Sequence, residues 1–272
     1  SRAITKRQHI AFCGYHGWHD WFIGTTNLNY GIPKFNNQLA HSFIYNDILS
    51  LEKIFSKYKK KIACIIMEPI TVNGPKSKPS GSTKWKDYNE KNNFLTDVKN
   101  LCRKNGALLI FDEVITGFRY DIGGAQKMFN VIPDLSCWAK AMSNGVPISA
   151  ITGNWKYLKY LEKTFFSFTY GGDCIGLAAA KATINKIEKK NVIDHLYSVG
   201  KLLKDNMNEL SKIYGLEDLI QCSGYPCRTV MSIRKTKKYN KPLITKTLIQ
   251  QELMSRGVLW SQYQSISFAH KK

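Results

Sequence analysis

Two adjacent carboxylates at the end of an apolar run constrain this chain more than any other feature. Five apolar residues, Ala107 to Phe111, lead directly into Asp112 and Glu113, and Gly117 follows soon afterwards. A short apolar run of this kind indicates a strand that is buried in a parallel sheet and delivers charge at its carboxyl end. Because ligands of open α/β sheets bind at that edge, we expect the functional site there.

A lysine in an otherwise uncharged stretch is the second feature. Lys140 is the only charged residue between Leu135 and Pro147. If its side chain is desolvated, its pKa falls and its amine becomes a nucleophile that can form a Schiff base with a carbonyl compound. We therefore expect a desolvated, reactive Lys140. The simpler alternative is that Lys140 is a surface residue and that Asp112 caps a loop.

The spacing of residues suggests two other kinds of site, one for a nucleotide and one for a metal. The strand with its carboxylates is also typical of P-loop ATPases, but the sequence has no Gly-x-x-x-x-Gly-Lys-Ser/Thr segment. His16, His19 and Asp20 have a spacing that could suit a metal, although two histidines without a third clustered ligand are a weak signal. Cys222 and Cys227 have no second pair, so we expect no zinc and no other metal.

Composition limits the class of protein. The 272 residues are 43% hydrophobic and 12% aromatic, which is enough for one large domain or two and excludes a disordered chain. No apolar run is long enough to span a bilayer, and no signal peptide is visible. The seven cysteines are scattered and odd in number, which indicates reduced thiols. We expect a cytoplasmic protein with no membrane partner.

The net charge of +20 raises the question of an anionic partner. The lysines are spread along the chain, and no DNA- or RNA-binding motif accompanies them. We therefore expect no nucleic acid as a partner. A phosphorylated cofactor or an acidic substrate would also be attracted by this charge, and a basic binding protein remains the alternative.

Apolar periodicity and turn residues predict the order of the elements. Alternating strands and helices in the first two thirds indicate an α/β fold with a mostly parallel sheet. A long amphipathic helix then leads into a smaller C-terminal part. Residues 21–45 lack clear periodicity, and within them 24–26, 30–33 and 36–37 are expected to be loops. The polar stretch 75–88 is also expected to be a loop. The predicted strands are 10–13, 61–67, 107–112, 148–152, 229–234, 258–260 and 266–268, and the predicted helices are 2–5, 47–58, 94–104, 156–163, 175–184, 192–214 and 244–256.

Five motifs, in this order, resemble those of the class III (fold-type I) pyridoxal-phosphate aminotransferases, and most closely those of the glutamate-1-semialdehyde 2,1-aminomutase-like branch. They are Phe111-Asp112-Glu113-Val114, Gly123-Gly124-Ala125-Gln126, Pro133-Asp134-Leu135, Lys140 and Gly145-Val146-Pro147. The resemblance implies a large domain that binds pyridoxal 5'-phosphate over residues 1–190. It also implies part of a smaller α+β domain over residues 191–272.

The resemblance also implies roles for single residues. Lys140 would be the catalytic residue that forms the Schiff base, and Asp112 would pair with the protonated pyridine nitrogen of the cofactor. The ring of Tyr15 would stack on the pyridine ring, with His16 beside it, as flat π-faces prefer. Val114 would pack on the opposite face of that ring.

Three further positions follow from the same resemblance. Glu68 would line the active site. Asn73 falls where the aminomutase-like members carry Asn and some ω-aminotransferases carry Glu, which favours the aminomutase-like branch. Thr169 would bind the cofactor phosphate of the other subunit, which implies a homodimer with a shared active site.

The implied activity is the transfer of an amino group between a small amine donor and a carbonyl acceptor, by a transaminase or by an aminomutase. A non-catalytic relative of the fold is the alternative. Class III chains are longer than this one. We therefore expect a fragment, with the family's phosphate loop before residue 1 and its final helix after residue 272.

Overall fold

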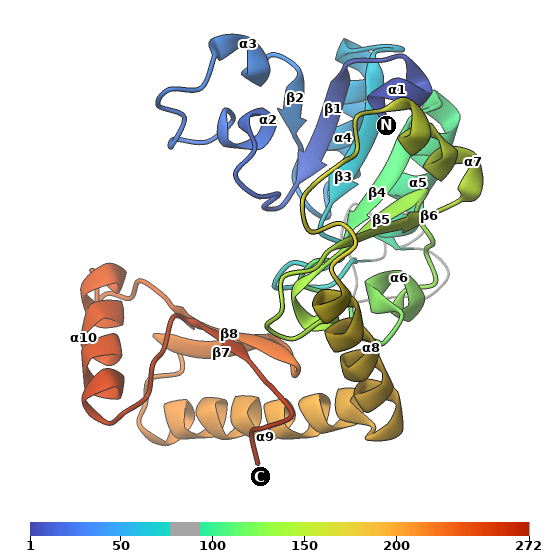
Figure 1. Cartoon of the computed structure of the whole chain (residues 1–272). Helices are drawn as coiled ribbons and strands as arrows, with labels where there is room; N and C mark the ends of the chain where they lie inside the picture. Colours follow the sequence, from blue (N-terminus) through green and yellow to red (C-terminus); the bar gives the residue numbers. More distant parts are fainter. Residues whose placement is uncertain (77–92, 272) are drawn as a thin grey trace. The chain divides into compact units, whose positions relative to one another are not determined.

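The computed structural model describes residues 1–76 and 93–271, and the chain divides into two units (Figure 1). The first unit is Ser1–Lys186 and the second is Ile187–Lys272. The polar loop expected at 75–88 lies almost wholly outside the described residues. Within the described part, no helix combines the length and apolar character needed to cross a membrane.

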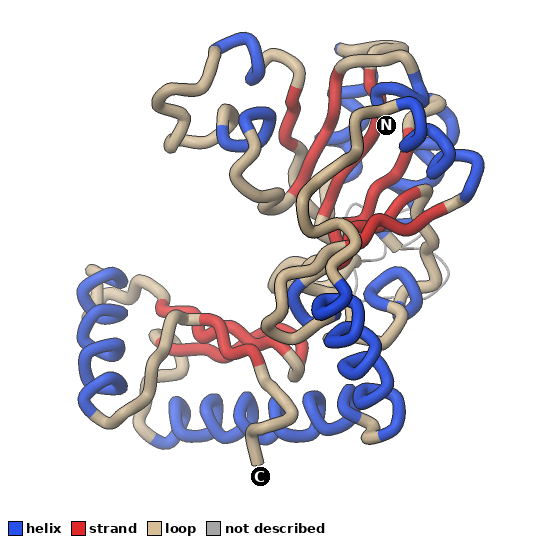
Figure 2. The backbone as a smooth tube through the Cα atoms, in the orientation of Figure 1, coloured by secondary structure: helices blue, strands red, loops and turns tan. Residues whose placement is uncertain are grey.

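The first unit is built around a six-stranded sheet. Figure 2 shows its strands in red. Its order is β2-β1-β3-β4-β5-β6, and all neighbours are parallel except β6, which is antiparallel to β5. The predicted α/β class with a mostly parallel sheet is confirmed. The strands are β1 (His9–Cys13), β2 (Ala40–Ser42), β3 (Ile62–Met67), β4 (Leu108–Asp112), β5 (Leu135–Trp138) and β6 (Ala150–Gly153).

Burial explains the strands at the centre of this sheet. Five of the six residues of β3 are buried, and both of its neighbours pair with it in parallel. Such strands need apolar residues on both faces, which is why they appear in the sequence as continuous apolar runs. The loops expected at 24–26 and 30–33 are confirmed, whereas the loop expected at 36–37 was wrong, because these residues end the short helix α3 (Lys34–Asn37). The same stretch also holds the edge strand β2 and most of the short helix α2 (Asp20–Ile23). These elements are too short to show periodicity.

Side chains cap the two longest helices that lie wholly in the first unit. The side chain of Asp47 accepts from the Ser50 N–H at the start of α4 (Ile48–Lys57), and that of Asn93 accepts from the Leu95 N–H at the start of α5 (Phe94–Asn105). Gly106 ends α5 with φ of 62°, in the left-handed region that favours glycine. The other helices are α1 (Arg2–Thr5), α6 (Gly124–Met128), η1 (Lys140–Met142), α7 (Trp155–Leu158), η2 (Lys159–Lys163) and α8 (Cys174–Lys189).

The second unit contains an antiparallel sheet of order β7-β8-β9. The prediction of edge strands at 258–260 and 266–268 was wrong, because the third strand lies between them. Trp260 and Ile266 are buried and supplied the apolar signal, while β9 itself is mostly exposed. The elements are α9 (Val192–Ile213), β7 (Ile220–Tyr225), β8 (Arg228–Ile233), α10 (Pro242–Ser255) and β9 (Tyr263–Ser265).

Two histidines join β1 to the edge strand β2. His9 Nδ1 lies 2.8 Å from His41 Nε2, and the His41 ring stacks on Tyr58 with a centroid distance of 3.9 Å. Burial, followed by the charges of His9 and Lys57, lowers the pKa of His41 to about 4. A hydrogen bond between two imidazoles needs one ring nitrogen without a proton, so protonation of the accepting ring breaks it.

We predict an acid-sensitive edge of the sheet. Because the pKa of His41 is lower in the folded than in the unfolded chain, the unfolded chain binds more protons between pH 6.5 and about 4. The stability that neutral His41 provides is therefore complete above pH 6.5 and is lost as the pH falls toward 4. Chemical denaturation across this range should show that the free energy of unfolding falls less steeply with falling pH in His41→Phe than in the unmodified protein. A control substitution, His19→Phe, should leave the slope unchanged, and equal slopes in all three proteins would contradict the prediction.

Candidate active site

Four parallel strands end at one edge of the sheet, and the candidate residues follow these ends. Tyr15 and His16 come after β1, and Glu68 comes after β3. Asp112 is the last residue of β4, and Lys140 begins η1, two residues after β5. The parallel topology thus brings to one edge residues that are more than 120 positions apart in the chain.

Asp112 and His16 form the closest polar contact at this edge. His16 Nδ1 lies 2.8 Å from Asp112 Oδ2, and His16 Nε2 lies 3.1 Å from the carbonyl oxygen of Cys13. The His16 side chain is 1% exposed and that of Asp112 is 14% exposed. The sequence suggested only that His16 lies beside Tyr15, so its contact with Asp112 is a finding of the structure. No local motif indicates it, because the partners lie on different strands.

The partners of His16 fix the number of protons that this pair holds. A carbonyl oxygen only accepts, so Nε2 must carry a proton to bond to Cys13. The contact of Nδ1 with the carboxylate then requires one more proton, on either Nδ1 or Asp112. The other oxygen of Asp112 accepts from the Val114 N–H at 3.1 Å. A carboxylate has about four acceptor positions, so Asp112 retains capacity for a further donor.

Glu113 points away from the exposed edge and has a structural role. It is fully buried and accepts from the Thr116 hydroxyl, from the Ala125 N–H at 3.0 Å and from the Gln126 N–H at 2.8 Å. Burial raises its pKa, and these hydrogen bonds oppose that shift. At Gly124, where φ is 75°, an added Cβ would lie 2.7 Å from this carboxylate. The Gly-Gly pair in the sequence was the available signal for this close approach.

Lys140 is not desolvated in this chain. Its side chain is exposed, so the expectation of a lysine buried among apolar residues was wrong. β6 pairs with β5 only as far as Trp138, and Lys140 lies two residues beyond this last paired residue. Its φ is 46°, which is uncommon for a residue with a Cβ and is found at functional sites more often than elsewhere.

A cavity of about 690 Å³ adjoins Lys140. Phe168, Tyr170 and Gly171 line it from the segment before α8, together with the stretch Gly145–Ala150. Asp173 anchors this segment, because its side chain accepts from the Gly176 N–H at 2.7 Å, as expected for a helix cap. Thr169 is exposed and lies between two residues that line the cavity.

The other predicted residues differ in exposure. Tyr15 is 60% exposed and lies edge to face with Phe22 at a centroid distance of 5.4 Å, so it is not a core tyrosine. Glu68 is half-buried and packs against Gly14, where an added Cβ would lie 2.9 Å from its carboxylate. Val114 is half-buried and Asn73 is exposed.

Two thiols near this edge are unreactive. Burial, then the charge of Glu68, raises the pKa of Cys13 to about 12. Burial, then the charge of Asp112, raises the pKa of Cys137 to about 11. A nucleophilic cysteine needs a thiolate at neutral pH, so neither thiol is suited to attack a substrate. No cluster of three metal-ligating side chains occurs among residues 1–76 and 93–271.

The donor set at this edge fits a flat, electron-poor ring that carries an aldehyde. Such a ring needs a carboxylate for its nitrogen, an aromatic face for stacking and an amine for its aldehyde. Asp112, Tyr15 and Lys140 supply these three groups. The +20 charge of the chain would attract a phosphate on the same molecule.

Comparison with known sequences agrees with this set of groups. The family model described as aminotransferase class-III matches residues 14–265. The 3-aminobutyryl-CoA aminotransferase of Cloacimonas acidaminovorans is 34% identical over 236 residues, which are 86% of this chain and 54% of that protein. The glutamate-1-semialdehyde 2,1-aminomutase of Clostridium beijerinckii is 36% identical over 231 residues, which are 79% of this chain and 51% of that protein. The chain spans about half the length of these relatives.

Solved structures share the fold. The FumI protein of Sphingopyxis sp. MTA144, in its PLP internal aldimine form, superposes with a TM-score of 0.84 at 24% identity. That match covers 99% of this chain and 62% of the FumI chain. The ornithine aminotransferase of Toxoplasma gondii ME49 superposes with a TM-score of 0.75 at 23% identity, over 92% of this chain and 56% of its own.

We predict that Glu113→Ala lowers the free energy of unfolding by about 2–4 kcal/mol, because it leaves buried donors without an acceptor. Glu113→Gln keeps two acceptor contacts and should lose less. Because burial raises the pKa of Glu113, its contribution to stability is complete below the unfolded pKa and declines as the pH rises through the folded pKa. Denaturant titrations at several pH values should show this decline in the unmodified chain and not in Glu113→Gln.

The matched control is Glu52→Ala, which removes an exposed carboxylate from α4 in the same unit. It should change the stability by less than about 0.5 kcal/mol. An equal loss in Glu52→Ala and Glu113→Ala would contradict the structural role of Glu113.

Proposed function

The chain belongs to the class-III aminotransferase family, and from that membership we propose that its site transfers an amino group between a small amine donor and a carbonyl acceptor. The observation that carries the proposal is the gathering of Asp112, Tyr15 and Lys140 at one sheet edge. The cofactor of this chemistry is pyridoxal phosphate, which withdraws electrons from the substrate carbon when bound. The chain's own residues bind it, orient it and move protons.

Lys140 is the residue that would hold the cofactor covalently through Nζ and then carry the proton between substrate positions. Its exposure leaves the amine accessible to an incoming aldehyde or substrate amine. The amine must lose a proton before it can act, so closure of the site around Lys140 on binding would favour its neutral form.

Asp112 would accept from the ring nitrogen and keep the nitrogen protonated. His16 holds Asp112 in place through the 2.8 Å contact and shares a proton with it. Because His16 is buried, this orientation costs no rearrangement when the ring binds. Tyr15 would stack on one face of the ring, and Val114 would contact the other.

The choice between intermolecular transfer and an intramolecular aminomutase rests on Asn73 and Glu68, the two wall residues after β3. Asn73 favours the aminomutase-like branch on the sequence resemblance. Its side chain is exposed and therefore accessible to a substrate. We propose the aminomutase as the second candidate on this observation alone. Incubation of the full-length protein with glutamate-1-semialdehyde alone tests this choice: an aminomutase should convert it without a second substrate, whereas a transaminase should need a separate amine donor and carbonyl acceptor.

We also propose a homodimer in which Thr169 reaches the cofactor phosphate of the partner. Large apolar side chains around Thr169 are exposed, and contiguous exposure of this kind marks interfaces. Phe165 is 96% exposed and Ile175 is 72% exposed. The free cysteines of the described chain support a reducing compartment, so we propose a cytoplasmic location.

We predict that borohydride fixes pyridoxal phosphate to Lys140 in the full-length protein. Added cofactor should give a visible absorption band, and peptide mapping after reduction should find the label on the peptide that contains Lys140. Lys140→Ala should lose both signals, whereas Lys163→Ala, at an exposed lysine of the same unit, should keep them. Equal labelling of many lysines, or no band at saturating cofactor, would reject the enzyme and favour a non-catalytic relative.

We predict that Phe165→Asp shifts the protein toward a monomer, because it places a charge in a surface that the partner would cover. Sedimentation velocity at several protein concentrations measures the change. Leu259→Asp, at another exposed apolar position, should leave the dimer intact. A dimer that survives Phe165→Asp unchanged, or a monomer at all concentrations, would contradict the proposed interface.

A further inference from the structure

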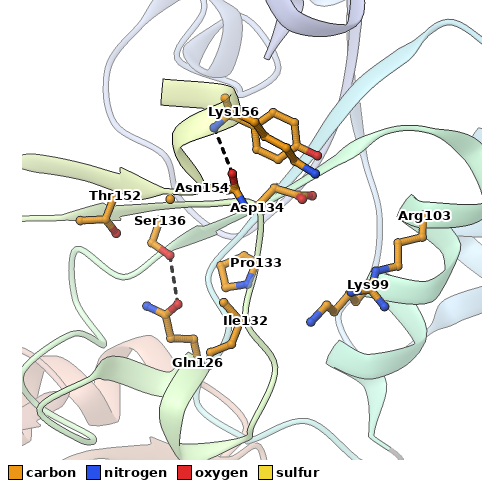
Figure 3. A pocket seen from close by; sticks show the side chains of 12 residues that line it. Lys99, Arg103, Gln126, Ile132, Pro133, Asp134, Ser136, Thr152, Asn154 and Lys156 are labelled. Atoms are coloured by element: carbon orange, nitrogen blue, oxygen red, sulfur yellow. Dashed lines mark hydrogen bonds between the residues drawn. The ribbon is translucent and has the colours of Figure 1, made fainter. Parts of the chain in front are cut away.

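A second cavity lies at the opposite end of β5 from the candidate active site. It has a volume of about 440 Å³. Its lining includes Asp134, the residue before β5, and Gly153, the last residue of β6. β5 spans about 10 Å at 3.3 Å per residue, and Lys140 lies two residues beyond its carboxyl end. Figure 3 shows the side chains that line this cavity.

Three cations surround the cavity. Lys99 and Arg103 are four residues apart on α5 and so share one helix face, and Lys156 comes from α7. Figure 3 shows Lys99 and Arg103 on the same side of Pro133. Among the residues that the structure describes, none of the three forms an ion pair. Burial, then the charge of Arg103, lowers the pKa of Lys99, and a bound anion would oppose this shift because it favours the charged amine.

Neutral donors complete the lining. The Asn154 side-chain oxygen accepts from the Lys156 N–H at 3.0 Å, which leaves its amide nitrogen available to donate. Thr152 Oγ1 accepts from Trp138 Nε1 at 2.8 Å, which leaves its hydroxyl hydrogen available. Cations and neutral donors together are the chemistry that binds phosphate oxygens.

The remaining lining residues suit the carbon skeleton of an organic ligand. Ile132 and Pro133 offer apolar surface, and Ile132 is 56% exposed. The Tyr157 ring also lines the cavity and carries Lys156 Nζ 4.6 Å from its centroid. Asp134 is the one carboxylate in the lining, and its Oδ2 accepts from the Leu109 N–H at 2.8 Å. A bare anion would be repelled by Asp134, whereas a ligand with a hydroxyl or amine could donate to it.

We propose that this cavity binds a small organic phosphate that also carries a hydroxyl or amine group. The phosphate lies between Lys99, Arg103 and Lys156, and the hydroxyl or amine donates to Asp134. This site is separate from the proposed cofactor site, and the proposal does not depend on the aminotransferase activity.

Isothermal titration calorimetry at low salt tests the proposal with glucose 6-phosphate, inorganic phosphate and glucose as probes. The protein is first loaded with pyridoxal phosphate and then freed of unbound cofactor by gel filtration, because free pyridoxal phosphate is itself an organic phosphate with a hydroxyl and would compete for this cavity. Glucose 6-phosphate should bind saturably and more tightly than inorganic phosphate, and glucose should not bind. The double variant Lys99→Gln/Arg103→Gln should weaken binding at least about tenfold, because it removes two charged donors.

The matched control is Lys53→Gln/Lys104→Gln, which removes the same charge from exposed positions on α4 and α5 outside the cavity. It should keep the affinity within about twofold, and glutamine preserves helix propensity in both doubles. Amide NMR signals of Gly153 and Asn154 should shift on binding. The proposal is overturned by equal loss in both doubles, by shifts elsewhere only, by the absence of binding, or by equal affinity for inorganic phosphate.

Discussion

Parallel pairing of β1, β3, β4 and β5 determines where the chemistry of this chain lies. Because these strands run in one direction, the residues that follow them meet at one edge, although they are far apart in sequence. The contact between His16 and Asp112 then ties the end of β1 to the end of β4 across the intervening strand. A slip of one residue in either register would move the partner to the other face of the sheet and break the contact. The geometry of the site therefore depends on backbone hydrogen bonds in the core.

The two neighbouring carboxylates show how one strand end supplies both function and support. Asp112 remains partly exposed and can accept a further hydrogen bond. Glu113 points inward, and its carboxylate accepts hydrogen bonds from Thr116, Ala125 and Gln126. Alternation of side chains across a strand makes this division unavoidable, since successive residues face opposite sides. The inward carboxylate holds the start of α6, and the outward one is left free for a ligand.

Much of this arrangement was predictable from local sequence. The apolar runs that predicted β3 and β4 are short-range signals, and the structure confirms both strands. The edge strand β2, the contact of His16 with Asp112 and the exposure of Lys140 were not predictable, because each depends on what other elements cover. Motif resemblance identified candidate residues, but only the topology shows which of them share an edge.

The close approach of Gly124 to Glu113 has a consequence for how this sequence can diverge. A side chain at position 124 has no room while the carboxylate is in place, since its Cβ would lie 2.7 Å from it. Replacing Glu113 first leaves its buried hydrogen-bond donors without an acceptor. Either single substitution gives a less stable protein, so one of the two positions cannot easily change while the other is kept. Descendants of this chain are expected to keep the glycine and the glutamate together, or to lose both.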